Sequence, residues 1–266
     1  MPTRILAKAS LALLFAGGLT ILSPAISSGV HAQTPPISAI PEETKAALDR
    51  MGKTLQAKQF SFRSHTLRAY AGPNGELLHI AHTMKTVVHR PDHLSVEVTG
   101  DDGSKQVFYD GKTLVVYDVG QKKYASLPVT GSIDQMLEVA EKRMKMDFPL
   151  ADLLTDDPAK SVLSGVTSGG QVGTAVIDGV PCRHFFFNQM DDLDLEFWLE
   201  DNDKALPRRL VVTYRSVPGR PTFTAELSDW DFTQQVPDTA FVFQPPAGAT
   251  KVEVQANTTA APAPAK

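Results

Sequence analysis

The sequence contains only one cysteine, Cys182, among its 266 residues. A single cysteine cannot close an internal disulfide bond, so the fold must be stabilised by packing. The formal net charge is −4, which excludes a general electrostatic attraction to nucleic acid or to an anionic membrane surface. Beyond the N-terminal region, no apolar run approaches the roughly 20 residues of a membrane-spanning helix. We therefore expect no nucleic-acid partner and no stable membrane insertion of the mature protein.

The N-terminal residues have the features of a cleavable export signal. Arg4 and Lys8 form a short basic region, and an apolar stretch over residues 11–22 follows it. Small residues then lead to Ala32, which fits the small-x-small rule for signal-peptidase cleavage. The apolar stretch is too short for a spanning helix, and the single cysteine lies too far away to carry a lipid anchor. We predict that residues 1–32 are a signal peptide and that the mature protein is exported.

Changes in composition mark the two ends of one folded domain. Residues 33–40 contain two adjacent prolines and predict a flexible leader. Residues 255–266 form a Pro/Ala-rich tail that has almost no apolar bulk, which is typical of disorder. No linker, low-complexity break or fixed-period repeat separates the residues between them. We therefore predict a single domain over residues 41–254.

Helical patterns are scarce. Residues 41–58 begin with a proline and an acidic first turn and carry an apolar stripe, which predicts an amphipathic helix. Residues 131–146 predict a second helix, with Ser132 as its N-cap and with Met136 and Met144 on its apolar stripe. A short helical turn is expected over residues 149–154.

Most of the remaining sequence alternates apolar and polar residues with period two, as in residues 193–200. This pattern predicts roughly nine strands, and the short turns between them favour antiparallel neighbours. Two substantial helices cannot cover the whole apolar face of so large a sheet, so the sheet must curl around them. The predicted fold class is mainly β with α (α+β). It is a strongly curved antiparallel sheet, or half-open barrel, closed by two or three helices.

Residues that could carry catalysis are few and poorly arranged. His79, His82, His89 and His93 lie close together in the sequence, but His79 and His82 point to opposite faces of a strand and no thiolate or carboxylate completes a tetrahedral set. Cys182 lies among apolar neighbours, which favours a buried and unreactive thiol. The glycine-rich segment over residues 168–173 reads as a loop without the lysine of a phosphate-binding motif. We expect no catalytic residue, no metal and no cofactor.

A curled sheet closed by helices encloses an apolar hollow, which is either filled by side chains or occupied by a ligand. Methionines on the helical stripes suit a surface that accepts varied apolar partners, although methionine also fills gaps in irregular cores. The residues expected to line the hollow are apolar and lie on the inward side of their strands and helices. They are Phe60, Phe62, Leu94, Val96, Met136, Met144, Leu195, Phe197, Leu210 and Val212.

Several segments resemble the LolA/LolB-like carriers, and more closely an uncharacterised family of predicted periplasmic proteins with that fold. The segments are "FYDGKTLVVYD", "IDGVPCRHFFF", "LEFWLEDNDKALPRRLVVTY", "DWDF" and "PDTAFVFQPPAGATKV". The resemblance implies a LolA-like half-barrel in the periplasm, with a hollow able to hold an acyl chain or the lipid part of a lipoprotein. LolA carries an arginine near its pocket on an early strand, and either Arg63 or Arg68 could correspond to it.

Two classes of function follow from this interpretation. The first is a periplasmic carrier or binding protein that holds a hydrophobic small molecule or lipid by burial of its apolar part. The alternative is an envelope protein-interaction or sensing domain with a packed core, whose partner is a periplasmic or envelope protein. Trp198, on the otherwise charged face of its strand, would then mark the contact surface. An enzyme of unknown type comes third, because no motif favours one.

Overall fold

The computed structural model describes residues 40–253, except residues 73, 145, 147 and 191. The predicted signal peptide, residues 33–39 of the predicted leader and the Pro/Ala tail lie outside the described residues. Within the described ranges, no helix has both the length and the apolar content needed to cross a bilayer.

The strands form one twelve-stranded sheet with the order β12-β6-β5-β4-β3-β2-β1-β11-β10-β9-β8-β7. Neighbouring strands are antiparallel, except that β12 runs parallel to β6. This arrangement confirms the predicted curved, largely antiparallel sheet. The strands are β1 (Gln59–Ala71), β2 (Leu77–His89), β3 (His93–Gly100), β4 (Gly103–Asp110), β5 (Thr113–Asp118), β6 (Lys123–Pro128), β7 (Val166–Ile177), β8 (Val180–Gln189), β9 (Leu193–Glu200), β10 (Pro207–Tyr214), β11 (Thr222–Asp231) and β12 (Thr250–Val252).

Both predicted helices form, with shorter bounds. The first is α1 (Glu42–Leu55), whose first turn is acidic. The second is α2 (Ile133–Val139), which begins with a capping box between Ser132 and Gln135 and continues as a π-helix, η1 (Ala140–Met144). Three shorter elements follow, and they are η2 (Ala151–Leu153), α3 (Pro158–Leu163) and η3 (Asp238–Phe241).

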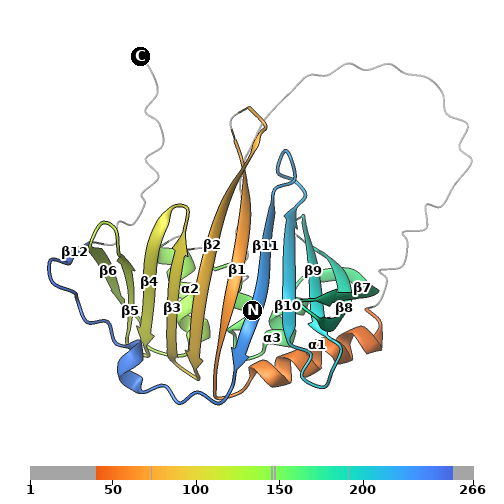
Figure 1. The fold of residues 1–266 in the computed structure, drawn as a ribbon, viewed down its shortest axis with the longest axis horizontal. Coiled ribbons are helices and arrows are strands. Elements are labelled where there is room, and N and C mark those ends of the chain that lie inside the picture. Colours follow the sequence, from red (N-terminus) through yellow and green to blue (C-terminus); the bar gives the residue numbers. More distant parts are fainter. Residues whose placement is uncertain (1–39, 73, 145, 147, 191, 254–266) are drawn as a thin grey trace, which may run out of the picture.

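The three α-helices lie on the same side of the sheet, near the lower end of the strands in Figure 1, and the β1–β2 hairpin rises beyond them. We call the side that they cover the inner face. The C-terminal segment packs on the opposite, outer face, where the Phe243 ring lies 5.5 Å from Phe108 and 5.0 Å from Tyr124. Strands β4 to β6 are therefore covered on both faces, whereas the tip of the β1–β2 hairpin projects past the helices.

One prediction about local structure was wrong. The glycine-rich segment over residues 168–173 is part of β7 and not a loop. The reason is the close approach of the neighbouring strand β8, since a Cβ atom at Gly169 would lie 2.5 Å from the Phe186 carbonyl oxygen and 2.5 Å from the Phe187 ring. Glycine at this position allows β8 to pair closely with β7 while Phe187 packs in the core.

Candidate functional site

The structure gathers the predicted lining residues in one place. Nine of them belong to a single buried hydrophobic core between the inner face and the helices, with exposed fractions from 0% to 7%. Met144 is only partly buried and packs against the edge of this core. The nine buried residues are Phe60, Phe62, Leu94, Val96, Met136, Leu195, Phe197, Leu210 and Val212. A ligand could reach them only if the helices moved, and their contact with a ligand stays a prediction.

The inner face of the sheet continues beyond the helices toward the top of the strands in Figure 1. Met84 and Val98 are paired across β2 and β3, and both are partly buried where they meet the core. Farther along β2, Ile80 is partly exposed and Leu78 is exposed at 54%. We call these four residues the upper inner face. They form a largely apolar surface, interrupted on β2 by His82 between Met84 and Ile80, that the helices do not fully cover.

The end of the helical segment supplies further partly buried apolar side chains. Met144, Met146 and Phe148 pack against the core without being fully buried by it. Sequence reasoning selected Met144 but missed Met146 and Phe148, because these two lie beyond the regular helical stripe. Flexible methionine side chains at the border of a core can adapt to apolar partners of different shape.

The structure distinguishes the two candidate arginines. Arg68 pairs with Phe223 of β11 and Ile80 of β2, so it lies on the inner face. Its guanidinium donates to the Tyr214 hydroxyl at 3.1 Å and lies 5.6 Å from the centre of the Phe223 ring. Arg63 lies on the outer face, half-exposed, and forms an ion pair with Asp229 at 3.3 Å. Arg68 is therefore the arginine that borders the upper inner face.

A buried hydroxyl group lies beside the same surface. Ser64 pairs with Met84 on the inner face and is 0% exposed. Its Oγ atom has no hydrogen-bond partner within the part of the chain that the structure describes. An unpaired buried hydroxyl costs about 1–3 kcal/mol, so a polar group placed next to Ser64 would be stabilised by it.

The start of α2 is anchored to the sheet by hydrogen bonds. The Tyr109 hydroxyl donates to the Gly131 carbonyl oxygen at 2.7 Å, and the Ile133 amide donates to the Pro91 carbonyl oxygen at 2.8 Å. Burial, together with the nearby carboxylates of Asp92 and Asp110, raises the pKa of Tyr109 to about 12. The hydroxyl therefore stays protonated and can keep donating throughout the physiological range.

A carboxyl group in the helical layer makes stability depend on pH. Asp152 is partly exposed as a residue, but the protein atoms around its carboxyl group desolvate it and raise its pKa. A hydrogen bond from the Ser161 hydroxyl, at 2.5 Å, opposes this shift without cancelling it. We expect Asp152→Asn to stabilise the fold by about 1 kcal/mol at pH 7, because the amide keeps the acceptor without a buried charge. Thermal melts over a pH series measure this effect.

The sign of the pH dependence follows from the direction of the shift. When the folded state raises the pKa of an acid, the folded state binds the proton more tightly, so stability falls as pH rises from the ordinary aspartate value to the raised one. Asp152→Asn should remove this decline and should give no gain below the ordinary value. Asp203→Asn, in an exposed loop, is the control. A gain of equal size at pH 3 and pH 7 would contradict the explanation.

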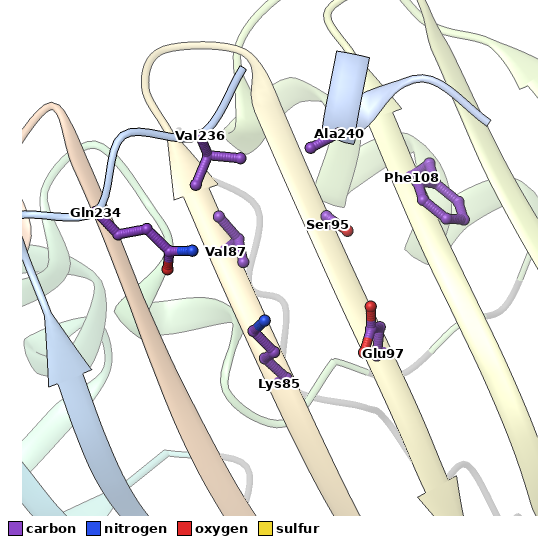
Figure 2. A pocket seen from close by; sticks show the side chains of 8 residues that line it. All are labelled: Lys85, Val87, Ser95, Glu97, Phe108, Gln234, Val236 and Ala240. Carbon is purple, nitrogen blue, oxygen red and sulfur yellow. The ribbon is translucent and has the colours of Figure 1, made fainter. Parts of the chain in front are cut away.

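A small crevice lies on the outer face, beneath the C-terminal segment (Figure 2). It encloses about 220 Å³ between that segment and strands β2, β3 and β4. Lys85 and Glu97 lie at its lower rim, and Gln234, Val236 and Ala240 approach from the C-terminal segment. The crevice is separated from the inner face by the sheet and shares no residue with the predicted lining set.

The histidines and the cysteine occupy places explained by their neighbours. His79 and His82 lie on opposite faces of β2, as predicted, and His82 bonds to Asp102 at 2.7 Å. Among the described residues, no three His, Cys, Asp or Glu side chains lie close enough together to hold a metal ion. Cys182 is buried, with 1% of its surface exposed. Desolvation is the main cause that raises the pKa of its thiol, and the nearby Glu200 carboxylate adds to it. A raised thiol pKa lowers the fraction of the cysteine that is present as the reactive thiolate.

Trp198 is less available for a partner than the sequence indicated. On the outer face its ring stacks on His184 at a centroid distance of 3.9 Å, and the Arg209 guanidinium lies 5.5 Å from its centre. His184 in turn bonds to Glu196 at 2.8 Å. These contacts within the sheet explain an aromatic residue on a charged face without an external partner.

The molecule is a curved antiparallel sheet closed on one face by helices, the class of fold predicted from its sequence. Residues 44–255 match the family described as "Predicted periplasmic protein (DUF2092)". The chain belongs to this family, which confirms the predicted resemblance to an uncharacterised family of predicted periplasmic proteins. A comparison with the curated proteins finds no match.

Three solved structures illustrate what the fold is similar to. One is an uncharacterized conserved protein from Thermus thermophilus, with 10% identity, a TM-score of 0.48 and coverage of 79% of this chain and 99% of that chain. Another is the Mycobacterium tuberculosis lipoprotein LppX, with 17% identity, a TM-score of 0.47 and coverage of 74% and 99%. A LolA superfamily protein from Nitrosomonas europaea has 11% identity, a TM-score of 0.38 and coverage of 75% and 97%.

Proposed function

We propose that this protein is a periplasmic carrier or binding protein that holds a hydrophobic ligand against the upper inner face. The ligand would be an acyl chain, a lipid or the lipid part of a lipoprotein. The observation that supports this most is that the apolar inner face extends past the region that the helices bury, where Met84 and Val98 remain only partly buried. A hydrophobic surface that its own fold leaves partly uncovered favours an apolar ligand.

Polar groups at the border of this surface could bind the polar end of such a ligand. Arg68 and Tyr214 lie on the inner face and are already hydrogen-bonded to each other. Ser64 adds a buried hydroxyl beside Met84. An acyl chain could lie along Met84 and Val98 while its ester or carboxylate accepts a hydrogen bond from the Arg68 guanidinium, four residues farther along β1 than Ser64. Each buried CH₂ contributes about 0.8 kcal/mol, from which the cost of association is subtracted, and no catalytic residue is needed.

Close packing of the lower inner face, which we define as the part of the inner face that carries the nine buried lining residues, favours the alternative function. The nine predicted lining residues in the core are buried without any ligand. If the protein's own side chains also cover the upper inner face in solution, no space is left for a ligand. The protein is then a domain with a packed core that binds an envelope partner through its surface. Lipid binding distinguishes the two candidates, because only the carrier requires it.

A charge placed on the upper inner face should weaken lipid binding. We expect Val98→Asp to raise the Kd for a fluorescent fatty acid by at least about 10-fold, because a carboxylate in an apolar contact must be desolvated. Thr99→Asp is the matched control, since the neighbouring residue on a strand points to the opposite face and Thr99 is exposed. Fluorescence titrations measure both variants, and melting curves check that each is folded.

Native mass spectrometry of protein purified from its own periplasm completes the test. A bound lipid mass that is present in the wild type and in Thr99→Asp, and reduced in Val98→Asp, would support the carrier. Protein that carries no lipid and binds no added fatty acid would overturn the carrier in favour of the packed domain. Equal Kd values for the two variants would remove the upper inner face as the binding surface.

A further inference from the structure

Strand β7 forms one end of the sheet, and Pro41 and Thr44 at the start of α1 lie close to its Gly170. Within the described residues, β8 is the only strand that pairs with it, and its other side has no neighbouring strand. An edge strand presents unpaired amide and carbonyl groups that can pair with another chain. The opposite end of the sheet is formed by the much shorter β12, at Thr250–Val252.

The sequence of β7 lacks two of the usual protections of an edge, charge and proline, although its register with β8 is irregular at two places, between Val166 and Ser168 and between Gln171 and Gly173. Its twelve residues, "VTSGGQVGTAVI", include no charged residue and no proline. Proteins commonly place lysine or proline on exposed edges to prevent strand pairing. The register with β8 is irregular between Gln171 and Gly173, but it is regular from Gly173 to Ile177. The C-terminal half of β7 is therefore a regular, uncharged edge.

Two large apolar side chains are exposed in this part of β7. Val176, in the regular half, is 70% exposed, and Val172, in the irregular segment just before it, is 59% exposed, the highest fractions among the large hydrophobic residues of the described chain. Thr174, between them, is also exposed. Val and Thr pair favourably across strands, because branched side chains pack well on a pleated surface.

We propose that the β7 edge binds the β7 edge of a second copy of this chain, forming a two-fold symmetric dimer with one continuous sheet. The argument for this occupant is self-complementarity. In an antiparallel pair centred on Thr174, Thr174 lies opposite itself and Gly173 lies opposite Ala175 of the other copy, within the regular part of the strand. Val176 of each copy faces Val172 of the other, at the irregularity between Gln171 and Gly173. Gln171 lies opposite Ile177, so no like charges meet. A two-fold axis uses the same patch on both copies, which is the commonest arrangement among oligomers.

Charge at the proposed interface should separate the copies. We expect the wild-type protein to sediment as a dimer, and Val176→Lys to weaken dimerisation on the order of 100-fold, because the two-fold axis would bury an unpaired charge from each copy. Val119→Lys is the matched control, since Val119 is 38% exposed in the turn between β5 and β6, away from β7. Sedimentation equilibrium over a concentration series measures both.

A cysteine at the two-fold axis gives an independent test. Directly opposite side chains on antiparallel strands have Cβ atoms about 4.5–5.5 Å apart, close to the separation that a disulfide bond needs. With copper phenanthroline and dioxygen as oxidant, Thr174→Cys should form a dimer joined by one disulfide bond, the two thiols losing two protons and two electrons. Thr99→Cys is the control, and the native Cys182 is buried.

Each outcome supports or overturns the proposal. A wild-type dimer that Val176→Lys dissociates and Thr174→Cys cross-links would support it. A monomer at all concentrations with no cross-link would overturn it, including the case in which the residues before α1 cover the β7 edge. A dimer that neither substitution affects would place the interface elsewhere and would also overturn it.

Discussion

Phe197→Ala is expected to lower the free energy of unfolding by about 3–5 kcal/mol, as for a large aromatic residue in a filled core. Phe197 is 1% exposed and lies between Phe185 of β8 and Leu210 of β10 on the inner face. A residue that lined a partly empty hollow would have fewer protein neighbours and would cost only about 1–2 kcal/mol. Urea denaturation of the ligand-free protein measures the difference.

Trp198→Ala provides the comparison at the next position, on the outer face. Trp198 is partly exposed, with its ring between His184 and Arg209, so its loss should cost about 1–2 kcal/mol and leave fatty-acid binding unchanged. If Phe197→Ala costs less than about 2 kcal/mol and weakens fatty-acid binding, Phe197 lies at the wall of a ligand cavity, and the lower inner face is not a filled core.

Most of the fold could be predicted from the period-two alternation of apolar and polar residues along the strands. Apolar residues at every second position of β9 face the core, and their polar neighbours face outward, as in Leu195 and Glu196. The predicted lining residues come together because all were chosen from such alternating runs or helical stripes. Sequence could not show how far the helices cover the inner face. That extent depends on how far each strand runs past the helices and on the path of the segment after α2. Met84 and Val98 were therefore missed as residues of the candidate ligand surface.

The side on which each arginine lies could have been inferred. Phe60 and Phe62 are inward-facing residues of β1, and side chains on a strand alternate between faces. Arg68 has the same parity as these phenylalanines and Arg63 the opposite one, provided that no bulge interrupts β1. The structure has β1 paired with β2 without interruption from Gln59 to Ala71. The sequence thus contained the signal, but the continuity of the strand had to be observed.

Arg90 shows what sequence reasoning could not find. In the sequence it precedes Pro91 and reads as part of a turn. In the structure its side chain joins the end of α1 to the segment after η2. Its Nε and Nη2 atoms donate to the Leu55 carbonyl oxygen at 3.2 and 3.0 Å, and Nη1 donates to the Leu154 carbonyl oxygen at 2.9 Å. Contacts between residues this far apart in sequence leave no local pattern.

Arg90→Ala should therefore destabilise the protein by about 3 kcal/mol, since each hydrogen bond to a charged group contributes roughly 1.5–3 kcal/mol and two carbonyl groups lose their donor. One of them is the last carbonyl of α1, which needs a partner at the helix end. The guanidinium also lies 5.8 Å from the centre of the Phe60 ring. Burial lowers the pKa of Arg90, although Asp156 partly opposes this. Urea denaturation measures the loss.

Arg90→Lys separates the geometry of the side chain from its charge. An ammonium group keeps the charge but cannot reproduce the planar fork that reaches both carbonyl groups, so this variant should recover less than half of the loss. Arg63→Ala is the control, because its exposed ion pair with Asp229 should contribute no more than about 1 kcal/mol. If Arg90→Lys is as stable as the wild type, charge alone accounts for the effect. The bridging of α1 to Leu154 by the guanidinium would then contribute nothing to stability.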